Sequence, residues 1–159
     1  MNITGKTILV TGANRGIGRA LVDEALKRGA RRVYAGTRQP LTHPDARVTP
    51  LTLDVTNAAQ IQAAVEKVAS LDILINNAGV ALYDDLSDRA VIEQHLAVNL
   101  FGPYSVTQAL LPLLTRSRGA VVNVLSVCKM SLLPVPSRVV VPGDTCNPNG
   151  RRSEGSSPE

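Results

Sequence analysis

The sequence ILVTGANRGIG, residues 8–18, joins an apolar run to a turn that contains three glycines. The apolar residues 8–10 predict a buried strand, and the residues after Gly18 follow a helical pattern. The order strand, glycine turn, helix allows a tight turn at Gly12, a close approach to the backbone, and free N–H groups at a helix N-terminus. The stretch therefore predicts a site for the pyrophosphate of a dinucleotide.

Short β-rich runs alternate with amphipathic segments along the chain, which predicts an α/β fold with a doubly wound parallel sheet of about five strands and helices on both faces. In the first helix the predicted apolar face holds Ile17, Ala20, Leu21 and Ala25. The expected strands are Lys6–Thr11, Arg32–Gly36, Arg47–Asp54, Leu71–Asn76 and Gly119–Ser126, and the expected helices are Gly16–Gly29, Asn57–Ala69 and Asp88–Leu114.

Composition restricts the class of protein. A chain of 159 residues with 44% hydrophobic and 19% charged residues suits one domain with a real core. The formal charge is +4, but Lys and Arg are scattered and aromatic residues make up only 3%, which argues against nucleic-acid binding. No apolar stretch reaches the roughly 20 residues of a membrane span, and no signal-peptide layout is evident, so we expect a cytoplasmic protein without membrane contact.

Isolated cysteines and histidines give no sign of a metal site. Cys128 and Cys146 form no CxxC pair, and His43 and His95 stand apart from them, so we predict no metal and expect His95 to be merely packed or exposed.

We divide the chain into a dinucleotide-binding domain, 1–137, and a divergent tail, 138–159, that we expect to be disordered because it is rich in Pro, Gly and Ser.

Four motifs in order carry a resemblance to a known family. The glycine turn has the spacing GxxxGxG after Thr11, Asp54-Val55 ends the third expected strand, NNAG occupies 76–79, and Asn99 lies in the long expected helix. Over about residues 4–137 the chain resembles the short-chain dehydrogenase/reductase family. The resemblance implies a Rossmann-type sheet and a nicotinamide dinucleotide cofactor.

The resemblance also implies which residues hold the cofactor: Asp54 at the adenine, and Asn77, Ala78 and Gly79 on the ribose side. Taken alone, 77–79 fits a strand-ending turn, and Asp54 fits a helix cap before Asn57. The residues predicted to bind the cofactor are Gly12, Asn14, Arg15, Gly16, Ile17, Gly18, Arg38, Asp54, Val55, Asn77, Ala78 and Gly79.

The end of the second expected strand indicates the type of dinucleotide. NAD sites of this kind place an acid there for the ribose 2′-hydroxyl, but the chain has Gly36-Thr37-Arg38. Arg38 and Arg15 are suited to charge-assisted hydrogen bonds with a 2′-phosphate, as in family members that use NADP. We therefore predict NADP(H) over NAD(H); the alternative is a solvated arginine at a turn.

The resemblance assigns Ser126 to substrate orientation and Asn99 to a water relay. Pro103 would free the carbonyl of Asn99 from the helical ladder. The family's tyrosine acid and its lysine should fall near 139 and 143, where Val139 and Gly143 stand. The catalytic set is therefore partial, and Ser126 alone also fits an ordinary strand-end hydroxyl.

Three interpretations follow. The first is an NADP(H)-dependent oxidoreductase acting on a carbonyl or secondary alcohol, inactive as this chain, which we expect to be C-terminally incomplete; the family's usual homo-oligomer is then in doubt. The second is a non-catalytic NADP(H)-binding or interaction module. The third is a non-functional product of a frameshift or truncation near Ser137.

Overall fold

The computed structural model describes residues 2–82 and 88–125. Ser126 and the predicted tail 138–159 lie outside the described residues. The strands are β1 (Thr7–Thr11), β2 (Arg32–Thr37), β3 (Val48–Thr52), β4 (Ile73–Asn76) and β5 (Ala120–Asn123). The helices are α1 (Gly16–Lys27), α2 (Ala58–Lys67), α3 (Arg89–Leu96) and α4 (Gly102–Ser117), with a π-helical turn η1 (Ala97–Phe101) between the last two.

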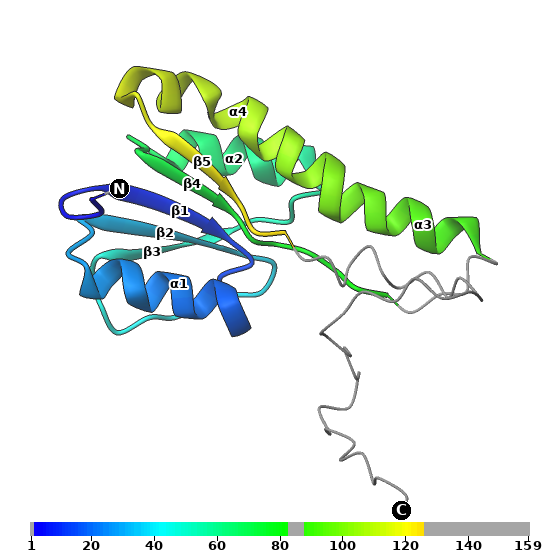
Figure 1. Ribbon diagram of the computed structural model, residues 1–159, viewed down its shortest axis with the longest axis horizontal. Helices are drawn as coiled ribbons and strands as arrows, with labels where there is room; N and C mark the ends of the chain where they lie inside the picture. The colour runs from blue at the N-terminus through cyan, green and yellow to red at the C-terminus, as the bar shows by residue number, and fades with distance from the viewer. Residues whose placement is uncertain (1, 83–87, 126–159) are drawn as a thin grey trace, which may run out of the picture.

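The five strands form one parallel sheet in the order β3-β2-β1-β4-β5 (Figure 1). Leu9 of β1 pairs with Tyr34 on one side and with Leu74 on the other, and Leu74 pairs with Val121. The strand order reverses at β1, because β2 and β4 lie on opposite sides of it. The predicted Rossmann-type sheet is confirmed, and its reversal point is where open α/β sheets bind ligands.

Helices cover both faces of the sheet, with α1 on one face and α2 and α4 on the other (Figure 1). Side chains alternate along β1, so Ile8 and Val10 belong to a core with Val22 of α1. Leu9, between them, belongs to a second core with Leu110 of α4. Because β1 is buried on both faces, its three central residues form an unbroken apolar run in the sequence.

The apolar face of α1 differs from the predicted one. Its buried residues are Gly18, Val22, Ala25 and Leu26. The prediction was right for Ala25 but wrong for Ile17, which is 63% exposed, and for Ala20, which is also exposed. The buried stripe starts at Gly18 because that residue packs under the glycine turn, and Ile17 is left on the outside of the first helical turn.

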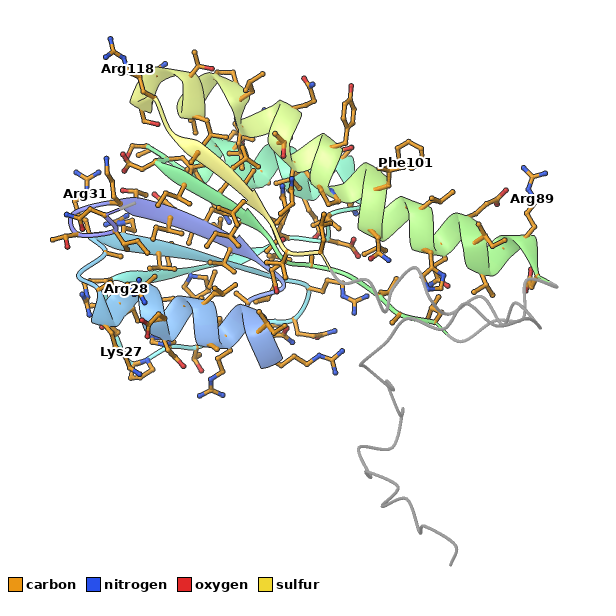
Figure 2. The ribbon with its side chains drawn as sticks, viewed as in Figure 1. Lys27, Arg28, Arg31, Arg89, Phe101 and Arg118 are labelled. Atoms are coloured by element: carbon orange, nitrogen blue, oxygen red, sulfur yellow. The ribbon has the colours of Figure 1, made fainter. Side chains whose placement is uncertain are left out.

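The single helix predicted over Asp88–Leu114 is instead interrupted by η1. In this π-turn the N–H of Gly102 donates to the carbonyl of Ala97, five residues back. Pro103 follows in the first turn of α4 and, because it has no N–H, donates no hydrogen bond back to the preceding residues. Phe101, at the end of η1, is 57% exposed and points away from the sheet (Figure 2).

Candidate functional site

The glycine turn lies at the carboxyl end of β1. Gly12 and Gly16 have φ of +66° and +55°, in the left-handed region that favours glycine. A Cβ on Gly12 would lie 2.9 Å from the Cα of Ala78, and one on Gly18 would lie 2.1 Å from the carbonyl oxygen of Gly12. A Cβ on Gly16 would meet nothing within 4 Å. Two glycines thus allow close packing within the protein, and Gly16 leaves the outer side of the turn open.

The N-terminus of α1 faces this open side. Arg15 is its N-cap residue and makes no capping hydrogen bond through its side chain, and the first turn of α1 has no acidic residue. The N–H of Arg19 donates to the carbonyl of Arg15 at 3.3 Å, so the N–H groups of residues 16–18 precede the helical ladder. The positive end of the helix dipole and an exposed guanidinium therefore meet here, which favours an anion.

A hydrogen-bonded lock fixes the glycine turn to the turn after β4. The hydroxyl oxygen of Thr11 accepts from the backbone N–H groups of Asn77 at 3.0 Å and Ala78 at 2.9 Å. In return, the amide nitrogen Nδ2 of Asn77 donates to the carbonyls of Thr11 at 3.0 Å and Gly12 at 3.2 Å. The side chain and the backbone N–H of Asn77 therefore both hold the protein's own turns together.

Arg38 and Asp54 follow β2 and β3 at the same edge of the sheet. The backbone N–H and the hydroxyl of Thr56 donate to Oδ1 of Asp54 at 2.9 and 2.7 Å, and together they hold the pKa of Asp54 below its ordinary value. The positive charge of Arg38 acts in the same direction, although more weakly. The N-cap of α2 is Asn57, so Asp54 is not the helix cap that its position also suggested.

These segments enclose a cleft of about 1010 Å³, of the size that takes a large ligand. All twelve residues predicted to bind the cofactor line it. The sequence did not identify the other lining residues, which are Gln39, Leu53, Thr56, Val80, Gln94, Ala97, Val98, Val124 and Leu125. For Gln94 and Val98 the sequence held one signal, a spacing of four residues that places both on one side of a helix.

Asn99 lies apart from this cleft. Its Oδ1 accepts from the N–H of Val80 at 2.9 Å and its Nδ2 donates to the carbonyl of Val80 at 2.8 Å, so the side chain is occupied by the backbone of that loop. Its carbonyl precedes Pro103 by four residues, as the predicted water relay requires. Ser126, the other predicted catalytic residue, lies outside the described residues.

A second, smaller groove of about 350 Å³ lies between α4 and β5 and includes Asn99, Tyr104 and Asn123. Asn76, also in its lining, is 3% exposed, and its Nδ2 donates to Thr107 at 3.1 Å and to Asn123 at 2.9 Å. Within the described part of the chain, Oδ1 of Asn76 has no partner. The groove therefore combines an apolar helix surface with a polar floor.

Membrane and metal features can be judged for residues 2–82 and 88–125, which the structure describes. No helix in these ranges is long and apolar enough to cross a membrane. The same ranges contain no group of three or more His, Cys, Asp or Glu side chains that could hold a metal ion.

The family model described as short chain dehydrogenase matches residues 6–138. The chain belongs to the short-chain dehydrogenase family. Among curated relatives, the short chain dehydrogenase tazN of Aspergillus terreus is 33% identical over 148 residues, which cover 82% of this chain and 32% of the relative. The family resemblance of the four sequence motifs is thereby confirmed.

Solved structures of short-chain dehydrogenases share the fold. A short chain dehydrogenase from Burkholderia cenocepacia, in complex with NADP, superposes with a TM-score of 0.76 at 38% identity and covers 80% of this chain and 56% of its own. The NADPH-bound carbonyl reductase from chicken fatty liver has a TM-score of 0.67 at 29% identity, covering 74% of this chain and 58% of its own. The chain thus spans about a third to somewhat over half of the length of these three relatives.

Proposed function

We propose that this short-chain dehydrogenase binds NADP(H) in the cleft between the glycine turn and the loops after β2, β3 and β4. The observation that carries the proposal is the convergence of all twelve predicted residues on one cleft at the reversal point of the sheet. The pyrophosphate belongs at the N-terminus of α1, beside the open side of Gly16. Asp54 and its neighbour Val55 then belong with the adenine.

Two arginines support the choice of NADP(H) over NAD(H). Arg15 and Arg38 both line the cleft, and both are exposed. The segment that follows β2 offers no carboxylate for a ribose 2′-hydroxyl, since Thr37, Arg38 and Gln39 stand there. A guanidinium fork suits a phosphate. The Burkholderia and chicken structures, solved with NADP and NADPH, agree with this choice.

We further propose that the site is of the type that exchanges a hydride with a carbonyl or secondary alcohol. The bound dinucleotide would supply or accept the hydride, and the protein would have to deliver a proton to the developing alkoxide. Asn99 and Ser126 are candidates for the water relay and for substrate orientation. The 159 residues contain no YxxxK motif. We therefore propose that this chain binds the cofactor without turnover, as a non-catalytic NADP(H)-binding module would.

The cofactor proposal is tested by titrating the full chain with NADPH and with NADH. A hydrogen bond to a charged group contributes about 1.5–3 kcal/mol, so Arg38→Ala should weaken NADPH binding roughly ten- to a hundredfold and leave NADH binding nearly unchanged. Arg19→Ala is the matched control, because Arg19 is exposed on α1 but does not line the cleft. Equal losses for both dinucleotides would refute the 2′-phosphate assignment.

A panel of aldehydes and ketones with NADPH separates the catalytic and non-catalytic interpretations. Thermal stabilisation by NADPH without substrate reduction supports the binding module. Measurable reduction would mean that another group of this chain provides the proton.

A further inference from the structure

The helix α3 is weakly attached to the rest of the fold. It has no buried residue, and its only neighbour among the described helices and strands is η1. It extends beyond the carboxyl ends of the strands, and Arg89 marks its far end (Figures 1 and 2). Something other than core packing must hold α3 beside the cleft.

Two side chains of the α3–η1 segment bind the loop after the NNAG turn. Asn99 bonds both the N–H and the carbonyl of Val80, and Nε2 of His95 accepts from the N–H of Leu82 at 2.9 Å. His95 and Asn99 are four residues apart, on one side of the helical segment, and Val80 and Leu82 are two apart, on one side of an extended segment. The helical surface thus supplies hydrogen-bond partners to the backbone of this loop.

The two hydrogen bonds of His95 define its protonation state. Nδ1 lies 3.0 Å from the carbonyl oxygen of Val91, which can only accept, so Nδ1 must carry a hydrogen. Nε2 must be unprotonated to accept from Leu82. Only the neutral tautomer with hydrogen on Nδ1 makes both bonds. A second proton would place an N–H against the N–H of Leu82 and abolish that bond.

The loop that His95 binds forms part of the cofactor cleft. Gly79 and Val80 line the cleft on one side of this contact, and Gln94 lines it on the helix side, next to His95 in sequence. We propose that His95 is a positioning residue, whose neutral imidazole holds the loop 80–82 against α3 and whose protonation releases the loop and weakens dinucleotide binding. The binding part of this proposal rests on the proposed function; the loop contact does not.

Among the described residues, the charged groups near His95 in the sequence and in the cleft have partners or positions of their own. On its own helix, Arg89 and Glu93 pair with each other at 2.7 Å, and Asp88 caps the helix through the N–H of Ala90. Residues 78–82 contain no titratable side chain. Arg15, Arg38 and Asp54 line the cleft but belong to the turns after β1, β2 and β3.

Amide hydrogen exchange and nitrogen-15 spectra of the full chain without ligand test the loop contact. Imidazoles ordinarily gain their second proton between pH 8 and pH 5. Over that range the protection factor of the Leu82 N–H should fall roughly two- to tenfold, as expected for one hydrogen bond, while that of Val80, held by Asn99, stays constant. The proposal is overturned if the ratio of the Leu82 and Val80 protection factors does not change with pH. It is also overturned if Nε2 of His95 carries a hydrogen at pH 8.

Binding of NADP⁺ across the same pH range tests the consequence for the cleft. His95→Gln offers an amide oxygen in place of Nε2 and does not titrate, so its affinity at pH 5 should exceed that of the wild type roughly two- to tenfold. The comparison between variants cancels the titration of the 2′-phosphate. His43→Gln is the control, since the sequence has only these two histidines and His43 does not line the cleft.

Equal pH profiles for the wild type and His95→Gln overturn the proposal. If no variant binds NADP⁺ at any pH, the proposed function fails instead, and the exchange of the Leu82 N–H alone then supports or overturns the role of His95.

Discussion

Replacement of Thr11 tests the lock between the glycine turn and the NNAG turn. The Thr11 side chain is 1% exposed, and its oxygen accepts two backbone N–H groups, those of Asn77 and Ala78. Thr11→Val keeps the shape of the side chain but leaves both donors without their acceptor. Thr11→Ser keeps the oxygen and removes one buried methyl group. The pair of variants therefore separates hydrogen bonding from packing.

The magnitude follows from the two orphaned donors. Each unsatisfied buried N–H costs about 1–3 kcal/mol. Because Asn77 and Ala78 are only half-buried, water can bond their N–H groups in part and so reduce this cost. We therefore expect Thr11→Val to lower the free energy of unfolding by about 2–4 kcal/mol in total. The lost methyl group in Thr11→Ser should cost about 0.5–1.5 kcal/mol. At roughly 3 °C per kcal/mol for a domain of this size, Tm should fall by about 6–12 °C and about 2–5 °C respectively.

Urea unfolding followed by far-ultraviolet circular dichroism measures both losses, since the described sheet and helices unfold with the lock. The two variants should have the same dependence on urea as the wild type and differ only in midpoint. If Thr11→Val is within about 0.5 kcal/mol of Thr11→Ser, the hydrogen bonds of Thr11 do not stabilise the lock and the reasoning is refuted.

Two further predictions concern the same edge of the sheet and its opposite edge. Gly16→Ala should lower the free energy of unfolding by about 1–2 kcal/mol, because Gly16 has a left-handed φ. Gly18→Ala should lower it by about 1–3 kcal/mol more than Gly16→Ala in urea unfolding, because only at Gly18 does a Cβ meet a backbone atom at 2.1 Å. The N–H of Thr7 holds the pKa of Asp72 below its ordinary value, so the stability that this carboxylate contributes is present above about pH 4 and lost as the pH falls further. Asp72→Asn should therefore be less stable than the wild type at pH 7, and the difference should shrink by pH 2–3 in thermal unfolding.

The strands and the glycine turn could be predicted because their signals are local. The middle of a strand that is buried on both faces is apolar, so Ile8, Leu9 and Val10 identify β1 without knowledge of its neighbours. All five strands were predicted at the right places. Within the described residues, most of the bounds that differ lie one or two residues too far out, whereas the second strand was predicted one residue too short, because β2 ends at Thr37 and not at Gly36. Gly12 and Gly18 were predicted from spacing alone, and the structure gives the reason, since neither position has room for a Cβ.

The partners of the polar side chains could not be predicted in the same way. Asn77 bonds Thr11 and Gly12, more than sixty residues earlier in the sequence, so no local pattern reveals that its amide is used inside the protein. The same holds for His95, whose isolated position suggested a packed or exposed side chain. Its bond to Leu82 exists only because the loop after β4 turns back along the helical segment.

The π-turn η1 and Gly102 after it position residues of the site, and the helical pattern of the sequence revealed neither feature. A Cβ on Gly102 would lie 2.6 Å from Cγ2 of Val55, so the start of α4 approaches the turn after β3 more closely than any other residue type would allow. Val55 lines the cleft, and the extra residue of η1 rotates the preceding helix relative to α4. Gly102 therefore seats α4 on the sheet core while η1 turns Asn99 and His95 toward the loop 80–82.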